Sequence, residues 1–290
     1  MTILLTGSTG FLGSYLLKAF VNNGDKVIAI KRSTSNTYRI EKYLSNIVSY
    51  DIDKTELSDI FQNHKIDLVV NTVTNYGRKD SKISSIVDAN VIFGLKLLEE
   101  SVNHKVQAFI NTDTLLDRNL NAYALSKGQL VDWMHFLSNH STKMINIKIE
   151  HMYGPLDDEN KFIYWVINQL KQNVEKIDLT SGQQKRDFIY IDDIVSAYET
   201  IIQNINTLSS FEEFELGRGE SIEVKVFIER ICRELSQQHS IDTLLNFGAI
   251  PYRDNENMCM AADISKLKEL GWNPIVSIED GIKKIINGED

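Results

Sequence analysis

The first half of the chain alternates between short apolar runs and longer stretches in which apolar residues recur at helical spacing. The apolar runs predict strands at 2–5, 26–30, 47–50, 68–73, 108–111 and 145–149. The helical spacing predicts helices at 11–20, 87–102 and 123–139. Repeated strand–helix units of this kind predict an α/β fold, a doubly wound parallel Rossmann sheet with helices on both of its faces.

The pattern becomes mixed after Tyr153-Gly154-Pro155. Helical spacing returns at 162–170 and 224–235, and a further helix closes before Pro274. We expect residues 1–155 to form a dinucleotide-binding domain to which 187–217 returns. Residues 156–290 are then expected to form most of a smaller C-terminal substrate-binding domain.

Composition and charge narrow the class of partner. The 290 residues include 40 acidic and 31 basic side chains, a formal net charge of −9, which argues against a nucleic acid or a membrane surface. The apolar run Ile3-Leu4-Leu5 follows no basic residue, and no stretch approaches the roughly 20 apolar residues that span a bilayer. The chain is therefore expected to work in the cytoplasm.

No metal site is expected. Cys232 and Cys259 have neither a metal-binding spacing nor a disulfide framework, and both are predicted to be buried, reduced thiols. The acidic run Asp157-Asp158-Glu159 is predicted to be a solvated turn.

A glycine-rich turn follows the first predicted strand. Gly7 permits a tight turn, Gly10 lets a pyrophosphate approach the backbone, and Gly13 lets the next helix pack close to the sheet. The N-terminus of that helix offers free N–H groups to phosphates. The predicted cofactor-binding residues of this turn are Gly7, Ser8, Thr9, Gly10, Phe11, Leu12 and Gly13.

The residues after the second strand bear on the choice of cofactor. Dinucleotide folds often place an acidic residue here for the ribose hydroxyls, but this chain has Lys31-Arg32-Ser33. Two cations and a hydroxyl suit a ribose 2′-phosphate, which favours NADPH over NADH. Asp51 and Ile52, after the third strand, are expected to touch the adenine, and Thr72 is expected to contact the cofactor.

A proton-transfer pair is predicted on the helix at 123–139. Tyr123 and Lys127 are four residues apart and share one helix face. A tyrosine with a pKa near 10 needs a cation to act near neutral pH, and Lys127 can supply it while holding the nicotinamide ribose. The substrate oxygen needs a further donor, and either Thr112 or Thr114 can serve.

With these motifs the chain resembles the extended short-chain dehydrogenase/reductases of the NAD-dependent epimerase/dehydratase family over nearly its whole length. The resemblance rests on the opening turn, on His151-Met152-Tyr153-Gly154-Pro155, on 182–193 with its Arg-Asp-Phe, and on 263–274. It implies that Arg186 and Arg253 contact a nucleotide diphosphate, as bidentate guanidinium groups do.

A narrower resemblance is to the CDP-paratose and CDP-abequose synthases, with the paratose enzymes the nearer. The stretches that carry it are 71–78, 149–154, 160–162, 179–188 and 246–250. It implies NADPH-dependent reduction of the 4-keto group of CDP-4-dehydro-3,6-dideoxy-D-glucose, for O-antigen and lipopolysaccharide synthesis. It also implies a homodimer formed through the long helices. The further residues implied to bind substrate are Tyr76, Arg78, His151, Lys161 and Phe162.

Several alternatives remain open. A 4,6-dehydratase uses Thr-Asp-Glu where this chain has Thr112-Asp113-Thr114. This chain therefore lacks the glutamate that acts as the base in dehydration. An NAD-dependent 4-epimerase or a dTDP-4-keto-6-deoxyhexose reductase would use the same Tyr123 and Lys127, whereas an NADP-sensing regulator would need neither. The chain also departs from the family in the short loop before Tyr123 and in Lys148, where an arginine is common.

Overall fold

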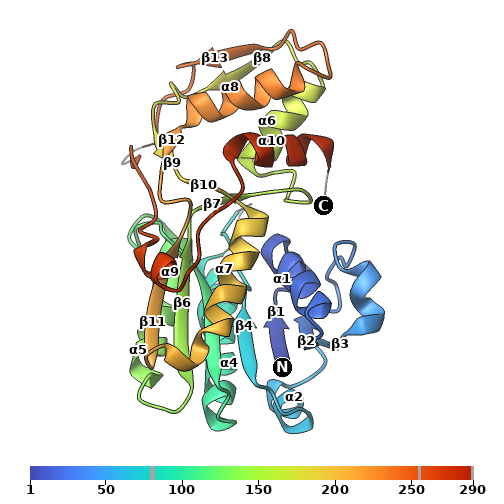
Figure 1. The fold of residues 1–290 in the computed structure, drawn as a ribbon, viewed down its shortest axis with the longest axis vertical. Coiled ribbons are helices and arrows are strands. Elements are labelled where there is room, and N and C mark those ends of the chain that lie inside the picture. Colours follow the sequence, from blue (N-terminus) through green and yellow to red (C-terminus); the bar gives the residue numbers. More distant parts are fainter. Residues whose placement is uncertain (79–81, 254–255, 289–290) are drawn as a thin grey trace. The chain divides into compact units, whose positions relative to one another are not determined.

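The computed structural model describes residues 1–78, 82–253 and 256–288 (Figure 1). The chain forms two compact units. The first unit comprises 1–149 and 198–215, and the second comprises 150–197 and 216–290. The expected division at residue 155, with a return at 187–217, is a division by function and stays a prediction.

The first unit is built on a seven-stranded sheet with the strand order β11-β6-β5-β4-β1-β2-β3. Register shows that β1 to β6 are parallel, and hydrogen bonds from Met144 to Ser210 and from Glu150 to Leu216 give β11 the same direction as β6. The predicted doubly wound Rossmann sheet is confirmed. Its strands are β1 (Thr2–Thr6), β2 (Lys26–Lys31), β3 (Val48–Asp51), β4 (Leu68–Asn71), β5 (Ala108–Thr114), β6 (Lys143–Ile149) and β11 (Phe211–Leu216).

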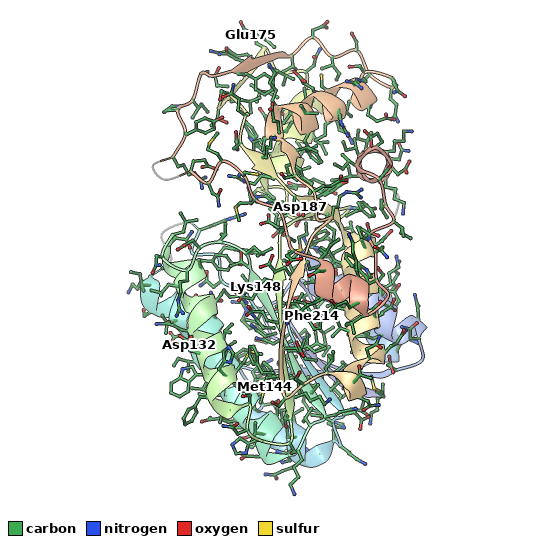
Figure 2. All side chains as sticks on the ribbon, turned by 60° about the vertical axis from the view of Figure 1, so that its left-hand side comes forward. Asp132, Met144, Lys148, Glu175, Asp187 and Phe214 are labelled. Atoms are coloured by element: carbon green, nitrogen blue, oxygen red, sulfur yellow. The ribbon has the colours of Figure 1, made fainter. Side chains whose placement is uncertain are left out.

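Strand residues alternate between the two faces of this sheet. Leu4, Val69, Phe109 and Met144 form one core with helices α2 (Leu57–Asn63), α4 (Phe93–Asn103) and α5 (Ala122–Leu137). Helix α1 (Phe11–Asn22) packs on β1 and β2, and α7 (Ile191–Gln203) ends in this unit before the short 3₁₀ turn Ile205–Thr207. Figure 2 shows Met144 and Lys148 on β6 and Phe214 on the neighbouring strand β11.

The predicted helix at 87–102 has a different form. It begins earlier, as α3 (Ile83–Val87), passes through a π-helical turn at Asp88–Ile92 and continues as α4. A π-turn inserts an extra residue into the helical repeat and so rotates the apolar stripe. This turn buries Asn90 beside Val91. The helix α2 and the 3₁₀ segment Glu41–Asn46 were not predicted.

The described residues of the second unit form three strand pairs and four further helices. The strand pairs are β7 (His151–Tyr153) with β10 (Phe188–Tyr190), β9 (Lys185–Arg186) with β12 (Ile222–Glu223), and β8 (Lys176–Leu179) with β13 (Leu244–Phe247). The helices are α6 (Phe162–Lys171), α8 (Val224–Leu235), α9 (Ser265–Glu269) and α10 (Ile278–Asn287). The predictions at 162–170 and 224–235 are confirmed, and α9 is the helix before Pro274. Over the described residues, no helix combines the length and the apolar character that a membrane crossing requires.

Two expectations about side-chain burial are wrong in part. Asp158 and Glu159 are exposed, as expected of the acidic run. Asp157 is buried rather than solvated, because Lys161, one helical turn later, pairs with it at 2.8 Å. Burial raises the pKa of this carboxyl in spite of that cation. Neither cysteine is fully buried, since Cys232 is half-buried on α8 and Cys259 is exposed; both are free thiols.

Candidate active site

The turn after β1 requires glycine at two positions. Gly7 has φ = 69°, and a Cβ there would lie 2.5 Å from Thr72 Oγ1. A Cβ on Gly13 would lie 2.1 Å from the Gly7 carbonyl oxygen. Thr72, which directly follows β4, closes the turn by donating its hydroxyl to the Thr6 carbonyl at 2.8 Å. Its observed contact is therefore with the turn itself.

The same turn leaves polar groups available to a phosphate. Helix α1 begins at Phe11, and no side chain caps its N-terminus at Gly10. The Phe11 and Leu12 side chains are buried, so only their backbone groups remain for a ligand. The Ser8 hydroxyl is buried and has no hydrogen-bond partner among the described residues. An orphaned hydroxyl beside an uncapped helix end fits a dinucleotide pyrophosphate.

The residues expected to bind the 2′-phosphate are engaged by two aspartates. Lys31 forms an ion pair with Asp51, which lowers the pKa of that carboxyl. Ser33 donates its N–H to Asp53 at 2.7 Å and its hydroxyl to the same carboxylate. Arg32 is exposed. Adenine would therefore have to compete with Lys31 for the Asp51 carboxylate.

Arg39 was not among the cofactor-binding residues predicted from the sequence. Its guanidinium donates to the Thr9 carbonyl of the glycine turn at 3.2 Å and lies 4.7 Å from the ring of Tyr38. The available signal was a basic residue in the loop after the second strand. This contact brings a cation to the loop that would carry the cofactor phosphates.

Tyr123 and Lys127 lie in the first two turns of α5. Asn121 caps the helix by accepting the Ala124 N–H at 2.9 Å, which fixes where the helix starts. The Lys127 side chain is 1% exposed, and its Nζ donates to Thr74 Oγ1 at 3.4 Å. Burial lowers the pKa of Lys127 to about 8, although Asp113 opposes this shift.

The two candidate threonines have different partners. The hydroxyls of Thr112 and Tyr198 are hydrogen-bonded at 2.7 Å in the core of the first unit. The Thr114 hydroxyl instead interacts with Tyr123. Strand β5 extends to Thr114, three residues beyond its predicted end, which carries this side chain to the tyrosine.

The electrostatics of Tyr123 differ from the expectation that Lys127 lowers its pKa. Burial raises the pKa of Tyr123 most, and Tyr76 and Asp113 raise it further. The hydrogen bond from Thr114 and the charge of Arg78 lower it, and Lys127 is not among these main influences. Tyr76 and Arg78, expected to bind substrate, thus lie beside the candidate proton donor Tyr123.

A ladder of amide side chains, also missed from the sequence, crosses the sheet beneath this cluster. Thr6 donates to Asn71 at 2.7 Å, Asn71 to Asn111 at 3.1 Å, and Asn111 to Asn146 at 2.9 Å. Asn146 then donates to Asp113 at 3.0 Å. The ladder fixes the Asp113 carboxylate near Lys127 and Tyr123.

The ladder has a second carboxylate end on β11. Asn146 also donates to Glu213 at 3.0 Å, and Glu213 pairs with Lys148. Lys148, which stands where an arginine is common, therefore balances a charge at the edge of the sheet (Figure 2).

The second unit holds the other predicted substrate residues. The Arg186 guanidinium pairs with Glu256 and donates to the carbonyls of Lys185 and Asn257 at 2.8 and 2.7 Å. His151 and Glu150 are hydrogen-bonded at 2.8 Å, and Lys161 is paired with Asp157 as described above. Phe162 and Arg253 are exposed, and the Phe162 ring stacks on Trp165.

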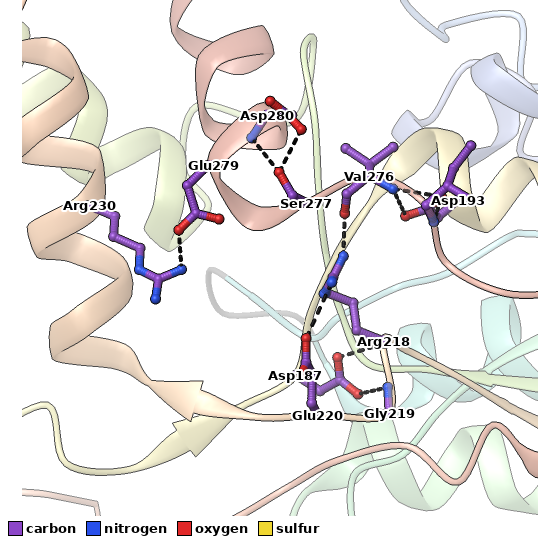
Figure 3. Close-up of polar contacts among 11 residues, drawn as sticks. Asp187, Asp193, Arg218, Gly219, Glu220, Arg230, Val276, Ser277, Glu279 and Asp280 are labelled. Carbon is purple, nitrogen blue, oxygen red and sulfur yellow. Dashed lines mark hydrogen bonds and ion pairs between the residues drawn. The ribbon is translucent and has the colours of Figure 1, made fainter.

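The acidic residues of the Arg-Asp-Phe stretch have structural partners (Figure 3). Asp187 is fully buried and accepts the N–H groups of Arg218, Gly219 and Ala262 at 2.7, 3.0 and 3.2 Å. Asp193 accepts the Val276 N–H at 3.1 Å, and the Arg218 guanidinium donates to the Val276 carbonyl. These carboxylates join separate loops of the second unit, which accounts for their place in the motif.

Within the described part of the chain, no group of three or more His, Cys, Asp or Glu side chains could hold a metal ion.

The chain belongs to the NAD dependent epimerase/dehydratase family, whose sequence profile matches residues 3–217. It is 32% identical to a CDP-abequose synthase of Salmonella typhimurium strain LT2 and 35% identical to that of Salmonella muenchen. Each comparison covers 98% of this chain and 97% of the relative. The dTDP-4-dehydro-6-deoxyglucose reductase of Escherichia coli is 26% identical over 98% of this chain and 96% of that protein.

Solved structures support the same fold. The UDP-glucuronic acid 4-epimerase of Bacillus cereus, in complex with NAD, superposes with a TM-score of 0.85 at 24% identity, covering 99% of this chain and 96% of that one. The UDP-glucose 4-epimerase of Thermotoga maritima, with UDP-glucose, gives 0.83 at 22% identity, covering 99% and 98%.

Proposed function

We propose that the protein is an NADPH-dependent reductase of the 4-keto group of a nucleotide-activated deoxyhexose, CDP-4-dehydro-3,6-dideoxy-D-glucose. The observation that carries the proposal is the cluster of Tyr123, Thr114 and Lys127 in the unit that contains the glycine turn. The similarity to two CDP-abequose synthases over nearly the full length of both chains supports the substrate class.

The proposed roles follow from the contacts. Bound NADPH would supply the hydride that reduces the ketone carbon. Tyr123 gives its proton to the ketone oxygen, and Thr114 holds that oxygen because its hydroxyl already interacts with Tyr123. Thr112 is engaged with Tyr198, so we assign it a structural role. Buried Lys127 is positioned by Thr74 to hold the nicotinamide ribose.

The preference for NADPH rests on three cations near the glycine turn. Lys31 ends β2 and Arg32 follows it, and Arg39 contacts Thr9 of the turn. Guanidinium groups bind phosphate through two parallel hydrogen bonds, so Arg32 and Arg39 are the stronger candidates for the 2′-phosphate. Lys31 already forms an ion pair with Asp51, so part of its contribution to NADPH binding is to neutralise that carboxylate.

We further propose that two copies associate through α4 and α5. The support is that Trp133 and Phe136 are 43% and 72% exposed on α5, and large exposed aromatics are typical of interfaces. A cytoplasmic role in O-antigen and lipopolysaccharide synthesis follows from the proposed substrate.

The competing activities differ in what happens to the cofactor. A reductase oxidises one NADPH for each sugar, a 4-epimerase consumes none, and a sensor leaves the sugar unchanged. The protein is incubated with NADPH and with CDP- and dTDP-linked 4-keto sugars, and cofactor absorbance and sugar products are followed together. The proposal expects stoichiometric oxidation with the CDP-linked 4-keto-3,6-dideoxyhexose. Preference for a dTDP-linked sugar, or turnover without oxidation, would contradict it.

A further inference from the structure

The segment after β4 places an aromatic ring and a cation against the proton donor. The ring of Tyr76 lies 5.1 Å from that of Tyr123, with 45° between their planes. The Arg78 Cζ atom lies 5.2 Å from the centre of the Tyr76 ring. Arg78, Tyr76 and Tyr123 thus form a series in which a guanidinium rests on one ring and that ring rests on the next.

This segment is held in place by specific contacts. The Asn75 N–H donates to Asn90 Oδ1 at 2.7 Å, and Asn90 Nδ2 donates back to the Asn75 carbonyl at 2.9 Å. Asn90 Nδ2 also reaches Ser126 on α5 at 2.9 Å, which ties the segment to the helix of Tyr123. Asn75 Oδ1 accepts the Gly77 N–H at 3.0 Å.

Gly77 sets the direction of the chain toward Arg78. Its φ is 68°, in the left-handed region that favours glycine. A Cβ at this position would lie 2.7 Å from Ile86 Cδ1 of α3. The glycine therefore lets the segment turn tightly against α3 and carry Arg78 back over Tyr76.

The charged groups around Tyr123 come from several elements. Asp113 of β5 disfavours the phenolate, as does Tyr76, whereas Arg78 favours it. Lys127 of the same helix is directed to Thr74, and Arg118 of the loop before α5 is paired with Asp132 at 2.8 Å. Among the described residues, Arg78 is thus a cation whose charge favours the Tyr123 phenolate.

We propose that Arg78, carried on the ring of Tyr76, is a positioning residue that stabilises the negative charge Tyr123 acquires when it gives up its proton. The inference rests on the proposed reduction. In that step the Tyr123 O–H bond breaks and a new O–H bond forms on the sugar, whose carbon receives hydride from NADPH. The remaining phenolate faces the field of Arg78 and then takes back a proton from solvent.

The test is the pH dependence of kcat for the reduction. The rate falls at alkaline pH as Tyr123 loses its proton before the reaction. Arg78→Met removes a charge that favours the phenolate, so this alkaline limb should move up by about one pH unit. The rate below the limb should fall about tenfold, because the tyrosine is then a weaker acid.

Three companion variants separate charge from shape. Arg78→Lys keeps the charge without the planar stack and should lie between wild type and Arg78→Met. Tyr76→Leu removes the ring beneath Arg78 as well as a hydroxyl that disfavours the phenolate, so its limb should lie above that of Tyr76→Phe. Tyr76→Phe keeps the ring and should not move it upward. Arg78→Lys and Tyr76→Leu carry the test if Arg78→Met does not fold.

Arg118→Met is the matched control, since it removes one exposed arginine of the same unit, and it should leave the limb in place. An unmoved limb in Arg78→Met with a change confined to KM would overturn the inference, as would an equal shift in Arg118→Met. The proposed function fails separately, if wild type reduces no keto sugar or if Tyr123→Phe retains full activity.

Discussion

Tyr123 and Lys127 each lie where burial opposes their charged form. Burial raises the pKa of the tyrosine and lowers that of the lysine to about 8. Burial thus favours the uncharged form of each side chain, the protonated phenol and the neutral amine. The sequence predicted this pair from its spacing, but it could not predict that Tyr76 and Arg78 lie beside the tyrosine. That depends on how 72–78 folds over α5.

Lys127 should make stability depend on pH in a defined window. Its pKa is about 8 in the folded chain and 10.5 in the unfolded chain, so the unfolded state binds more protons between these values. Stability should therefore rise with pH across this window, by up to about 3 kcal/mol. Urea unfolding at several pH values should show that Lys127→Met loses this rise. Lys96→Met, which changes an exposed residue of α4, is the control and should keep it.

Lys31 should act on cofactor choice partly through Asp51. Lys31→Ala removes a cation and also releases the charged Asp51 carboxylate, which would repel a 2′-phosphate. NADPH affinity, measured by fluorescence titration, should therefore fall much more than NADH affinity. Lys31→Ala combined with Asp51→Asn should recover part of the loss. An equal loss for both cofactors, or a wild-type preference for NADH, would contradict the account.

Arg186 and Glu256 should have opposite effects on nucleotide binding. Arg186→Ala should weaken CDP binding by 10- to 100-fold, about 1.4–3 kcal/mol, because a charged phosphate loses its partner. Glu256→Gln should strengthen binding, because Arg186 no longer has a carboxylate partner. Calorimetry with CDP measures both. Normal CDP binding in a folded Arg186→Ala protein would leave Arg186 with a purely structural role.

At the scale of elements, hydrophobic patterning predicted the strands β1 to β6 and the helices α1, α4, α5, α6 and α8. It did not predict β11, α7 or α10, nor the polar features within the predicted elements. The π-turn at Asp88–Ile92 changes the helical phase, which a regular repeat cannot reveal. Asn71, Asn111 and Asn146 lie at buried positions of strands that read as apolar, and their pairing depends on strand order. Short strands of two to four residues in the second unit carry too little periodicity to predict.

The amide ladder should contribute substantially to stability. Asn111→Ala would leave Asn71 without its acceptor and Asn146 without its donor inside the sheet. Each of these two unsatisfied buried groups costs about 1–3 kcal/mol, so the free energy of unfolding should fall by about 2–6 kcal/mol. Chemical denaturation measures the loss, with Ser49→Ala, at an exposed position of β3, as the control. A change below about 1 kcal/mol would mean that the ladder is not formed.

At the scale of the whole molecule, the sequence predicted the Rossmann sheet, its glycine turn and the family. The chain reaches this sheet in separate pieces, since Tyr198–Glu215 joins residues 1–149 in the first unit. Proximity of Thr112 to Tyr198, 86 residues later, could not be predicted from local pattern. For this reason the sequence left Thr112 and Thr114 as equal candidates, and the fold shows that their hydroxyls have different partners.

The most direct measurement of the central claim uses NADPH labelled with deuterium at the transferred position of nicotinamide C4. The labelled cofactor and the CDP-linked 4-keto-3,6-dideoxyhexose are incubated with wild type and with Tyr123→Phe, and the sugar is examined by NMR. The account predicts one deuterium at C4 of the product for each NADPH oxidised. It also predicts a rate about 10²- to 10⁴-fold lower for Tyr123→Phe, with NADPH binding unchanged. Product without deuterium, or Tyr123→Phe turnover within tenfold of wild type, would contradict it.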